Sequence, residues 1–364
     1  MKARTVRVSL GPRSYPIEIG MGTLGGVGEA VKARTGAARA LLVSVPPVDR
    51  AYGAAVSRSL RAAGLKVHRF GVPDGERSKR LRQAERLIAE MLDAGADRGS
   101  SVVVALGGGV VGDLAGFVAA TLFRGIPIVQ VPTSLLAMVD SSVGGKTGVN
   151  VPQGKNLVGV FHQPSLVWVD AGTLATLPLR QLRAGMAEVV KHAAIWDERL
   201  FRRLERDVDA LLALETDVVL PILERNCRIK AQVVSRDERE AGLRMLLNFG
   251  HTLGHAVEAL RRYRGVLHGE AVSIGMAYAA AHSERLGIAA AGTRERLEAL
   301  LVRIGLPTAL PRFERRAYLR AISVDKKKRD AHIRFVALRR IGQAETVPLR
   351  PRELLPAGVL PRSR

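Results

Sequence analysis

The sequence predicts an α/β domain with a parallel sheet over residues 1–176, followed by a mostly α-helical domain over residues 177–364. In the first part, short β-branched runs alternate with helical stretches, which is typical of a parallel sheet with crossover helices. After Pro178, apolar residues recur at helical spacing up to about residue 322. A chain of 364 residues is long enough for two domains with separate cores.

The strands of the first domain are predicted from short apolar runs. The N-terminal residues 1–10 alternate like a first strand. Buried strands are expected at 40–45, 65–70, 101–106, 126–132 and 165–170, with helices at 47–63, 78–94 and 114–122 between them. In the second domain Gly and Pro residues divide the helical pattern, and one strand-like piece is expected at 332–338.

Composition excludes several classes of protein. The longest apolar stretch, 126–139, is broken by prolines and falls short of the ~18 residues of a membrane span, and the N-terminus has no signal core. The single Cys227 fits a reducing compartment, so we expect a cytoplasmic protein with no membrane partner. The net charge of +22 suggests nucleic-acid binding, but the basic residues are scattered and aromatic residues make up only 4%. A charged, solvated surface is the simpler interpretation, with no specific nucleic-acid partner.

The balance between lysine and arginine is itself informative. Only 11 of the 56 Lys and Arg residues are Lys. The two are not interchangeable where a compact, titratable ammonium is needed, so the lysines of this chain should be enriched at functional positions. Lys146, Lys155 and Lys191 lie inside Gly-rich or acid-containing motifs.

A histidine-rich stretch between Asn248 and Glu270 indicates a metal centre. His251, His255 and His268 lie within 18 residues, although the chain has only eight histidines. His251 and His255 share one helical face, and Glu188 in the upstream G-M-A-E-V-V-K-H motif could complete a His2Glu zinc site. An isolated helical histidine pair is more often structural, so the assignment depends on the rest of the chain.

A glycine-rich loop follows the predicted strand 101–106. Gly107, Gly109 and Gly112 fit the G-x-G-x-x-G pattern that lets a pyrophosphate approach the start of a helix. The loop is not at the first strand, and no acidic residue lies about 20 positions further on; Asp113 follows it instead. A tight structural turn is the alternative interpretation.

The densest motif is V-P-T-S-L-L-A-M-V-D-S-S-V-G-G-K-T-G-V-N at 131–150, followed by G-K-N at 154–156. Core packing accounts for its leucines and methionine. It does not account for the hydroxyl groups of Thr133 and Ser134 at a strand end, or for Asp140 and Lys146 among small residues.

With these motifs the chain resembles the 3-dehydroquinate synthases. The resemblance covers nearly the whole chain and also includes P-D-G-E-R-S-K, F-R-G, N-C-R-I-K, D-E-R-E-x-G-L-R-x-x-L-N-F-G-H-T-x-G-H, L-H-G-E-A-V and D-K-K in the order of the family. It implies a Rossmann-like NAD-binding domain, a metal- and substrate-binding helical domain and a homodimer.

The resemblance also implies roles for individual residues. The metal ligands are Glu188, His251 and His268, normally binding zinc, with cobalt as an alternative. The NAD site comprises Asp74, Gly75, Glu76, Arg77, Ser78, Lys79, Gly109, Val110, Val111, Gly112, Asp113, Thr133, Ser134, Lys146, Lys155, Asn156, Thr173, Leu174, Ala175 and Thr176. The substrate residues are Asp140, Lys146, Lys191, Lys230, Glu240, Arg244, Asn248 and His255, one of Lys326 and Lys327, and Arg124, which reaches the phosphate in the neighbouring subunit.

The implied reaction converts 3-deoxy-D-arabino-heptulosonate 7-phosphate into 3-dehydroquinate and phosphate, in the shikimate pathway to aromatic amino acids. The chain departs from the family at Val45, where Asn or Asp usually lies near the adenosine ribose; Ser44 is a potential substitute. Another sugar-phosphate cyclase, such as a 2-deoxy-scyllo-inosose synthase, is the nearest alternative. A metal-dependent polyol dehydrogenase and a nucleic-acid-binding protein are more distant ones.

Overall fold

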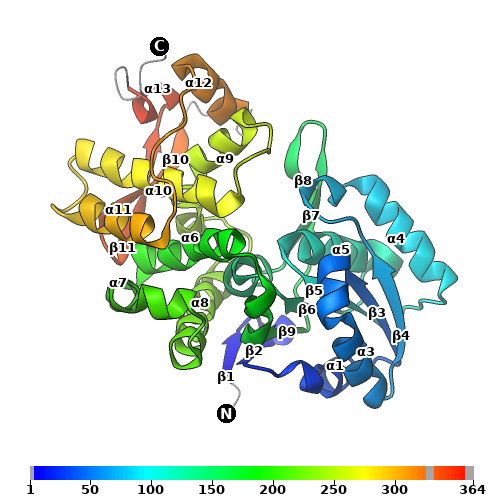
Figure 1. Ribbon diagram of the computed structural model, residues 1–364. Helices are drawn as coiled ribbons and strands as arrows, with labels where there is room; N and C mark the ends of the chain where they lie inside the picture. Colours follow the sequence, from blue (N-terminus) through cyan, green and yellow to red (C-terminus); the bar gives the residue numbers. More distant parts are fainter. Residues whose placement is uncertain (1–3, 325–331, 357–364) are drawn as a thin grey trace. The chain divides into compact units, whose positions relative to one another are not determined.

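The computed structural model describes residues 4–324 and 332–356, which form two compact units (Figure 1). Unit 1 contains residues 1–178 and 214–239, and unit 2 contains residues 179–213 and 240–364. Unit 1 is built on a seven-stranded sheet in the order β1-β2-β9-β6-β5-β3-β4. All neighbouring strands are parallel except β1 and β2, so the predicted fold class is confirmed.

Alternation along the strands explains why helices cover both faces of this sheet. In β3 (Arg39–Ser44), Leu41 and Val43 pack in one core cluster with residues of α4 (Leu81–Asp93) and α5 (Gly109–Thr121). Ala40 and Leu42 point the other way, into a cluster with residues of α1 (Val27–Thr35) and α3 (Ala54–Ala62). Because both faces are buried, the strand reads as a continuous apolar run.

The remaining strands of the sheet lie close to the predicted positions. Their bounds are β1 Arg4–Val8, β2 Tyr15–Gly20, β4 Lys66–Gly71, β5 Ser101–Gly107, β6 Ile128–Pro132 and β9 Leu166–Asp170. The hairpin of β7 (Lys146–Val151) and β8 (Gly154–Phe161) was not expected from the sequence. Its three glycines weaken the strand signal. Gly148 and Gly159 are needed there because a Cβ on either would lie within 3 Å of backbone on the other strand.

The domain division differs from the prediction in one helix. The sequence placed all of 177–364 in the helical domain, whereas α8 (Thr216–Arg236) belongs to unit 1. It packs against β1 and β2, with an ion pair of 2.6 Å between Arg4 and Glu224 and a hydrogen bond from the Ser9 amide to Ser235. Helical periodicity cannot reveal which core an amphipathic helix joins.

Unit 2 is mostly helical. It contains α6 Leu179–Trp196, α7 Glu198–Leu212, α9 His251–Leu260, α10 His268–Arg285, α11 Thr293–Ile304, α12 Arg315–Val324 and α13 Pro351–Leu354. The predicted strand at 332–338 is β10 (Ile333–Arg340), which pairs with β11 (Gln343–Leu349). Within the described ranges, no helix is long and apolar enough to cross a membrane.

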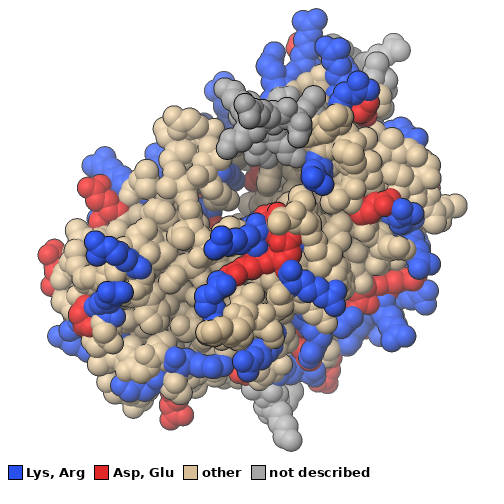
Figure 2. Space-filling model, turned by 180° about the vertical axis from the view of Figure 1, so that it is seen from behind, with Lys and Arg blue, Asp and Glu red and all other residues tan. Residues whose placement is uncertain are grey.

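The basic surface is dispersed on the face shown in Figure 2. Blue Lys and Arg side chains are spread over it, with Asp and Glu among them. Elsewhere in the chain, ion pairs such as Arg296–Glu205 and Arg180–Glu270 also bring basic and acidic side chains together. The pattern fits the interpretation of the positive charge as a solvated surface.

Candidate functional site

The order of the strands in unit 1 places a topological switch point at the carboxyl ends of β3 and β5. The chain runs from β3 outward to β4, returns to β5 on the other side of β3, and continues to β6. Connections that leave neighbouring strands in opposite directions mark the position where open α/β sheets bind ligands. The glycine-rich loop lies at this point, since β5 ends at Gly107 and α5 begins at Gly109.

The glycines of this loop are of two kinds. A Cβ on Gly107 would lie 2.7 Å from a methyl of Val111, and one on Gly112 would lie 2.8 Å from the amide oxygen of Gln130. Both are therefore explained by packing. A Cβ on Gly108 would meet nothing closer than the Ser134 hydroxyl at 3.4 Å, an ordinary contact, and Gly108 has an extended backbone open to any residue. This open cradle at a helix N-terminus fits a bound pyrophosphate.

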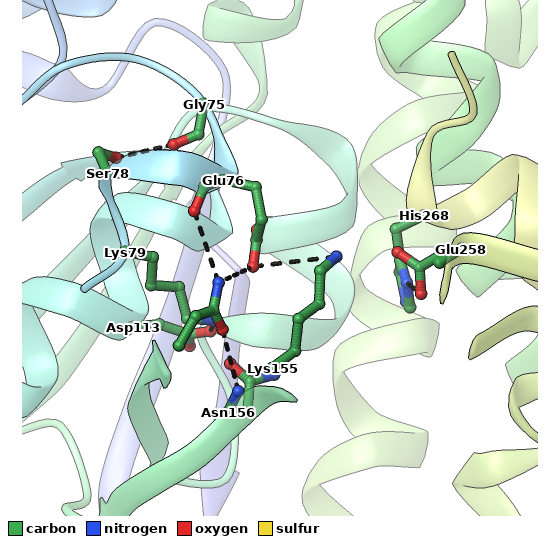
Figure 3. Close-up of polar contacts among 10 residues, drawn as sticks. Gly75, Glu76, Ser78, Lys79, Asp113, Lys155, Asn156, Glu258 and His268 are labelled. Carbon is green, nitrogen blue, oxygen red and sulfur yellow. Dashed lines mark hydrogen bonds and ion pairs between the residues drawn. The ribbon is translucent and has the colours of Figure 1, made fainter. Parts of the chain in front are cut away.

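Figure 3 shows a polar network that joins three candidate NAD-binding segments of unit 1. Asn150 donates to the Glu76 carboxylate at 2.7 Å, and its own side-chain oxygen accepts the Asn156 amide at 2.9 Å. Lys155 lies 3.9 Å from the same Glu76 carboxylate. The loop 74–79 and the β7–β8 hairpin are thereby held together.

Lys79 joins the loop 74–79 to α5. Its buried ammonium forms an ion pair with Asp113, in the first turns of the helix. Burial raises the pKa of Asp113, and the positive charge of Lys79 opposes this effect. The Ser78 hydroxyl donates to the Gly75 carbonyl at 2.7 Å, which closes the turn.

The other candidate NAD-binding residues lie just after strands of this sheet. Thr133 and Ser134 directly follow β6, and the Thr133 amide donates to the Gly107 carbonyl at 3.0 Å. Residues 173–176 lie in the 3-10 helix Ala171–Thr176 after β9, where the Tyr52 hydroxyl lies 2.8 Å from the Thr176 hydroxyl. The carboxyl ends of β5, β6 and β9 therefore carry the predicted segments.

The structure shows the surroundings of Val45 and Ser44, the two residues considered for the ribose contact. Val45 is buried and follows β3, as expected for the ribose position. Ser44 is also buried, and its hydroxyl donates to the Leu106 carbonyl of β5 at 2.8 Å. The Ser44 hydroxyl therefore uses its hydrogen within the sheet.

Two candidate substrate residues of unit 1 form an ion pair. Lys230, on α8, places its ammonium 2.6 Å from the Asp140 carboxylate and also donates to the Asp140 carbonyl. Lys230 is only 5% exposed. Lys146, the first residue of β7, is exposed.

In unit 2, close helix packing brings the three candidate metal ligands together. Glu188 lies on α6, His251 begins α9 and His268 begins α10. A Cβ on Gly269 would lie 1.8 Å from the Ala184 carbonyl oxygen of α6, and one on Gly275 would lie 1.8 Å from the Gly250 carbonyl oxygen. Only glycine permits these approaches, so the glycines next to the histidines set the spacing of the ligands.

The distances between the ligand atoms fit a single metal ion. The Nε2 atoms of His251 and His268 lie 3.7 and 3.5 Å from Glu188 Oε1. Ligands about 2.0–2.1 Å from a tetrahedral zinc ion are roughly 3.4 Å apart, so little movement is needed to bind one. Glu188 is fully buried, and carboxylates are rarely buried unless a cation is close.

The two histidines differ in their electrostatic surroundings. Burial and the nearby ammonium of Lys191 lower the pKa of His251 to about 3, which keeps its imidazole neutral. At His268 burial also favours the neutral ring, but hydrogen bonds to Glu188 and Glu258 outweigh it and raise the pKa to about 10. The carboxylates thus favour positive charge at this position, which a divalent ion would supply in place of the proton.

The structure places the other candidate substrate residues of unit 2 as follows. Lys191 is 1% exposed, and its ammonium lies 2.5 Å from Glu188 Oε2. The two histidines face the other oxygen of that carboxylate, Oε1. Asn248 donates to Glu240 at 2.6 Å. Arg244 is 2% exposed, in the 3-10 helix 243–248. His255 is exposed, and its ring centre lies 5.3 Å from that of His251. Lys326 and Lys327 lie outside the described residues.

Backbone strain coincides with several candidates. Arg124, Asn156 and Glu240 have positive φ angles of 65°, 54° and 61°, although non-glycine residues seldom adopt them. Only seven described non-glycine residues do so, which makes three candidate site residues a notable share. Such strain is concentrated at functional sites, where the surrounding structure holds it in place.

Three residues of these networks were not predicted. Asn150 belongs to the V-N end of the dense motif and joins the NAD-binding segments. Gln130 donates to the Gly112 carbonyl at 3.2 Å, and it is a polar residue in a buried strand. Glu258 lies beside His268. Its spacing of seven residues from His251 places both on the same helical face, and this spacing could have revealed it from the sequence.

Solved structures of sugar-phosphate cyclases have the same fold. A 2-deoxy-scyllo-inosose synthase complexed with carbaglucose-6-phosphate, NAD⁺ and Co²⁺ is 27% identical, with a TM-score of 0.86 over 96% of this chain and 98% of that one. A 2-epi-5-epi-valiolone synthase from Streptomyces hygroscopicus with NAD⁺ and Zn²⁺ bound is 30% identical, with a TM-score of 0.86 over 95% and 96%. A probable glycerol dehydrogenase from Sinorhizobium meliloti, 20% identical with a TM-score of 0.66 over 93% of each chain, shares the fold alone.

Sequence comparisons distinguish among these relatives. Residues 69–184 match the family described as 3-dehydroquinate synthase N-terminal, and residues 185–328 match its C-terminal counterpart. The 3-dehydroquinate synthase of Geobacter metallireducens is 50% identical over 95% of this chain and 96% of its own length. That of Citrifermentans bemidjiense is 47% identical over 94% of each chain. The chain therefore belongs to the 3-dehydroquinate synthase family.

Proposed function

We propose that this protein converts 3-deoxy-D-arabino-heptulosonate 7-phosphate into 3-dehydroquinate and phosphate. The observation that carries the proposal is the combination of an open glycine cradle at the switch point with a group of one buried glutamate and two half-buried histidines. Relatives at 44–50% identity over nearly the full chain carry the name of this enzyme, whereas the solved 2-deoxy-scyllo-inosose synthase is 27% identical.

The two cofactors supply different chemistry. When bound, NAD would supply reversible hydride transfer at a ring carbon that bears a hydroxyl, and a divalent metal would supply Lewis-acid polarisation of that hydroxyl oxygen. Gly108 and Gly109 would admit the pyrophosphate at the start of α5, and Lys79, Asp113, Asn150 and Glu76 would hold the surrounding loops in place. Glu188, His251 and His268 would hold the metal.

The substrate carries a carboxylate and a phosphate, so cationic side chains should bind it. Lys146, Lys191, Lys230 and Arg244 are the candidates. Buried Lys191 and Lys230 are each already held by a carboxylate, which fixes the direction of the ammonium. His255 is exposed beside the histidine pair and is the candidate for proton transfer, because an imidazole titrates near neutral pH.

We further propose zinc as the metal, with cobalt as a substitute, because both ions are found in similar cyclases and the donor set suits zinc. We also propose a cytoplasmic homodimer. The dimer is supported by β8, which pairs only with β7 among the described strands and exposes Leu157, Val160 and Phe161. Exposed apolar edge strands tend to pair with another chain. Arg124, held in a strained turn, would contribute to the partner's phosphate site.

The test is release of phosphate from the heptulosonate phosphate by metal-loaded protein, measured with and without NAD. We expect release to require NAD in catalytic amount, with 3-dehydroquinate as the product. Glucose 6-phosphate serves as the comparison substrate for an inosose synthase. A preference for glucose 6-phosphate would assign the chain to that activity instead.

A further inference from the structure

Glu258 is a buried carboxylate in unit 2 that no step of the proposed reaction uses. It lies on α9, seven residues after His251 and three after His255, so the three side chains share one face of the helix. Only 4% of it is exposed. Removing a carboxylate from water is unfavourable unless a hydrogen-bond donor or a cation compensates, so its position calls for a partner.

One partner is the imidazole of His268. Glu258 Oε2 lies 3.4 Å from His268 Nδ1, and Figure 3 shows the carboxylate beside that ring. The other ring nitrogen, Nε2, lies 3.5 Å from Glu188 Oε1. A metal-binding imidazole is neutral and has one N–H, so a donor bond from Nδ1 to Glu258 leaves the Nε2 lone pair facing Glu188.

We propose that Glu258 is a positioning residue of the metal centre, which fixes the tautomer and orientation of His268 and strengthens it as a ligand. The inference rests on the metal centre of the proposed function. A carboxylate behind a metal-bound histidine raises the basicity of the ring, and its loss typically weakens metal binding ~10–100-fold.

His251 provides the internal comparison. Its Nδ1 lies 3.1 Å from the Phe249 carbonyl, a neutral acceptor that belongs to the backbone and cannot be removed by substitution. The two histidines are thus oriented in different ways, one by main chain and one by a side chain. Of the two groups that contact a histidine Nδ1, only the Glu258 side chain can be removed by substitution, and its removal should lower the metal affinity.

The test measures zinc affinity of the full-length protein by competition with a chromophoric chelator. In E258Q the amide oxygen can still accept the Nδ1 proton but the charge is lost, so we expect about 10-fold weaker binding. In E258A both are lost, and we expect nearly 100-fold. Both variants should still bind one ion per chain, because Glu258 is not a ligand, and both should keep wild-type NAD affinity.

Glu270→Gln is the matched control. Glu270 lies two residues after His268 on the same helix, but its carboxylate bonds Arg180 and the Leu267 amide instead. The zinc affinity of the Glu270→Gln protein should equal that of the wild-type protein. Thermal unfolding of the metal-free proteins separates a folding defect from a metal defect, and E258D, which keeps the charge on a shorter arm, should fall between wild type and E258A.

Unchanged zinc affinity in both E258Q and E258A would overturn the positioning role. A stoichiometry near zero in E258A, with the metal-free protein folded, would also overturn it, since Glu258 would then be a ligand. Absence of any bound ion from the wild-type protein would be a different result: it would remove the proposed metal centre, and the role of Glu258 with it.

Discussion

The glycines beside the two candidate sites serve opposite purposes. In unit 1, Gly108 faces open space at the start of α5, where a side chain would meet only an ordinary contact. In unit 2, Gly269 and Gly275 are pressed against backbone carbonyl oxygens of neighbouring segments. We propose that the first admits a ligand to the backbone, and that the second lets helices approach closely enough to assemble the candidate metal ligands. Substitution should therefore affect binding in one unit and folding in the other.

Gly269→Ala should have the largest effect. Its Cβ would lie 1.8 Å from the Ala184 carbonyl oxygen, so α10 must shift away from α6, at about 3 kcal/mol or more. We expect a lower melting temperature together with loss of bound metal and activity. Gly25→Ala is the control, because a Cβ on Gly25 would meet no other atom within 4 Å. A fully stable Gly269→Ala protein would refute the packing role.

His268→Ala should abolish turnover while leaving the helices assembled. One of three ligands is lost, so metal content should fall far below one ion per chain. The exposed His332 is the control residue, and His332→Ala should behave as wild type. Metal analysis measures the expected loss of the ion, and circular dichroism measures whether the helices remain. Full occupancy with normal turnover would exclude His268 as a ligand.

Lys191→Arg should have an intermediate effect. Lys191 is buried against Glu188 at 2.5 Å, and a planar guanidinium cannot occupy the position of a compact ammonium. We expect retained zinc and NAD and at least a ~10-fold loss of kcat/KM, or about 1.4 kcal/mol of transition-state stabilisation. The exposed Lys66 provides a control, Lys66→Arg. Near-wild-type kinetics for Lys191→Arg would show that the scarcity of lysine carries no functional information.

Gly108→Ala should have the smallest effect on the protein itself and act through NAD alone. The extended backbone and the open surroundings admit a methyl group, so stability should change little, whereas NAD should bind about 10-fold more weakly because the methyl occupies the cradle. Gly116→Ala, on the same helix, should do the reverse, since its Cβ would lie 2.4 Å from a methyl of Thr147. Calorimetry and thermal unfolding compare the two. Unchanged NAD affinity in Gly108→Ala would mean that the loop is only a turn.

The same contrast explains what the sequence could and could not predict. Strand and helix periods identified the parallel sheet and the helical region, and the family resemblance implied the group Glu188, His251 and His268, which the structure brings together. The assignment of α8 to unit 1 could not be predicted, because its partners, β1 and β2, are more than 190 residues away in the chain. The distinction between Gly107 and Gly108 was also inaccessible, since it depends on where Val111 and Ser134 point.

Residues that act through another residue were the hardest to foresee. Glu258 contacts a ring nitrogen of His268, and Asn150 joins two loops. Helical spacing and membership of the dense motif point to these two positions, but they do not show which residue each side chain contacts. Ser44 shows the converse: the sequence offered it as a ribose contact, but its hydroxyl is used by the neighbouring strand. Contacts between segments distant in sequence decide such cases.

In the proposed reaction NAD is regenerated in every turnover, and a divalent metal activates the substrate. The most direct measurement records phosphate release and NADH absorbance in the same reaction with the heptulosonate phosphate. We predict many equivalents of phosphate per NAD, with no net accumulation of NADH. Accumulation of NADH in step with substrate consumption, without phosphate release, would contradict this account and indicate a polyol dehydrogenase.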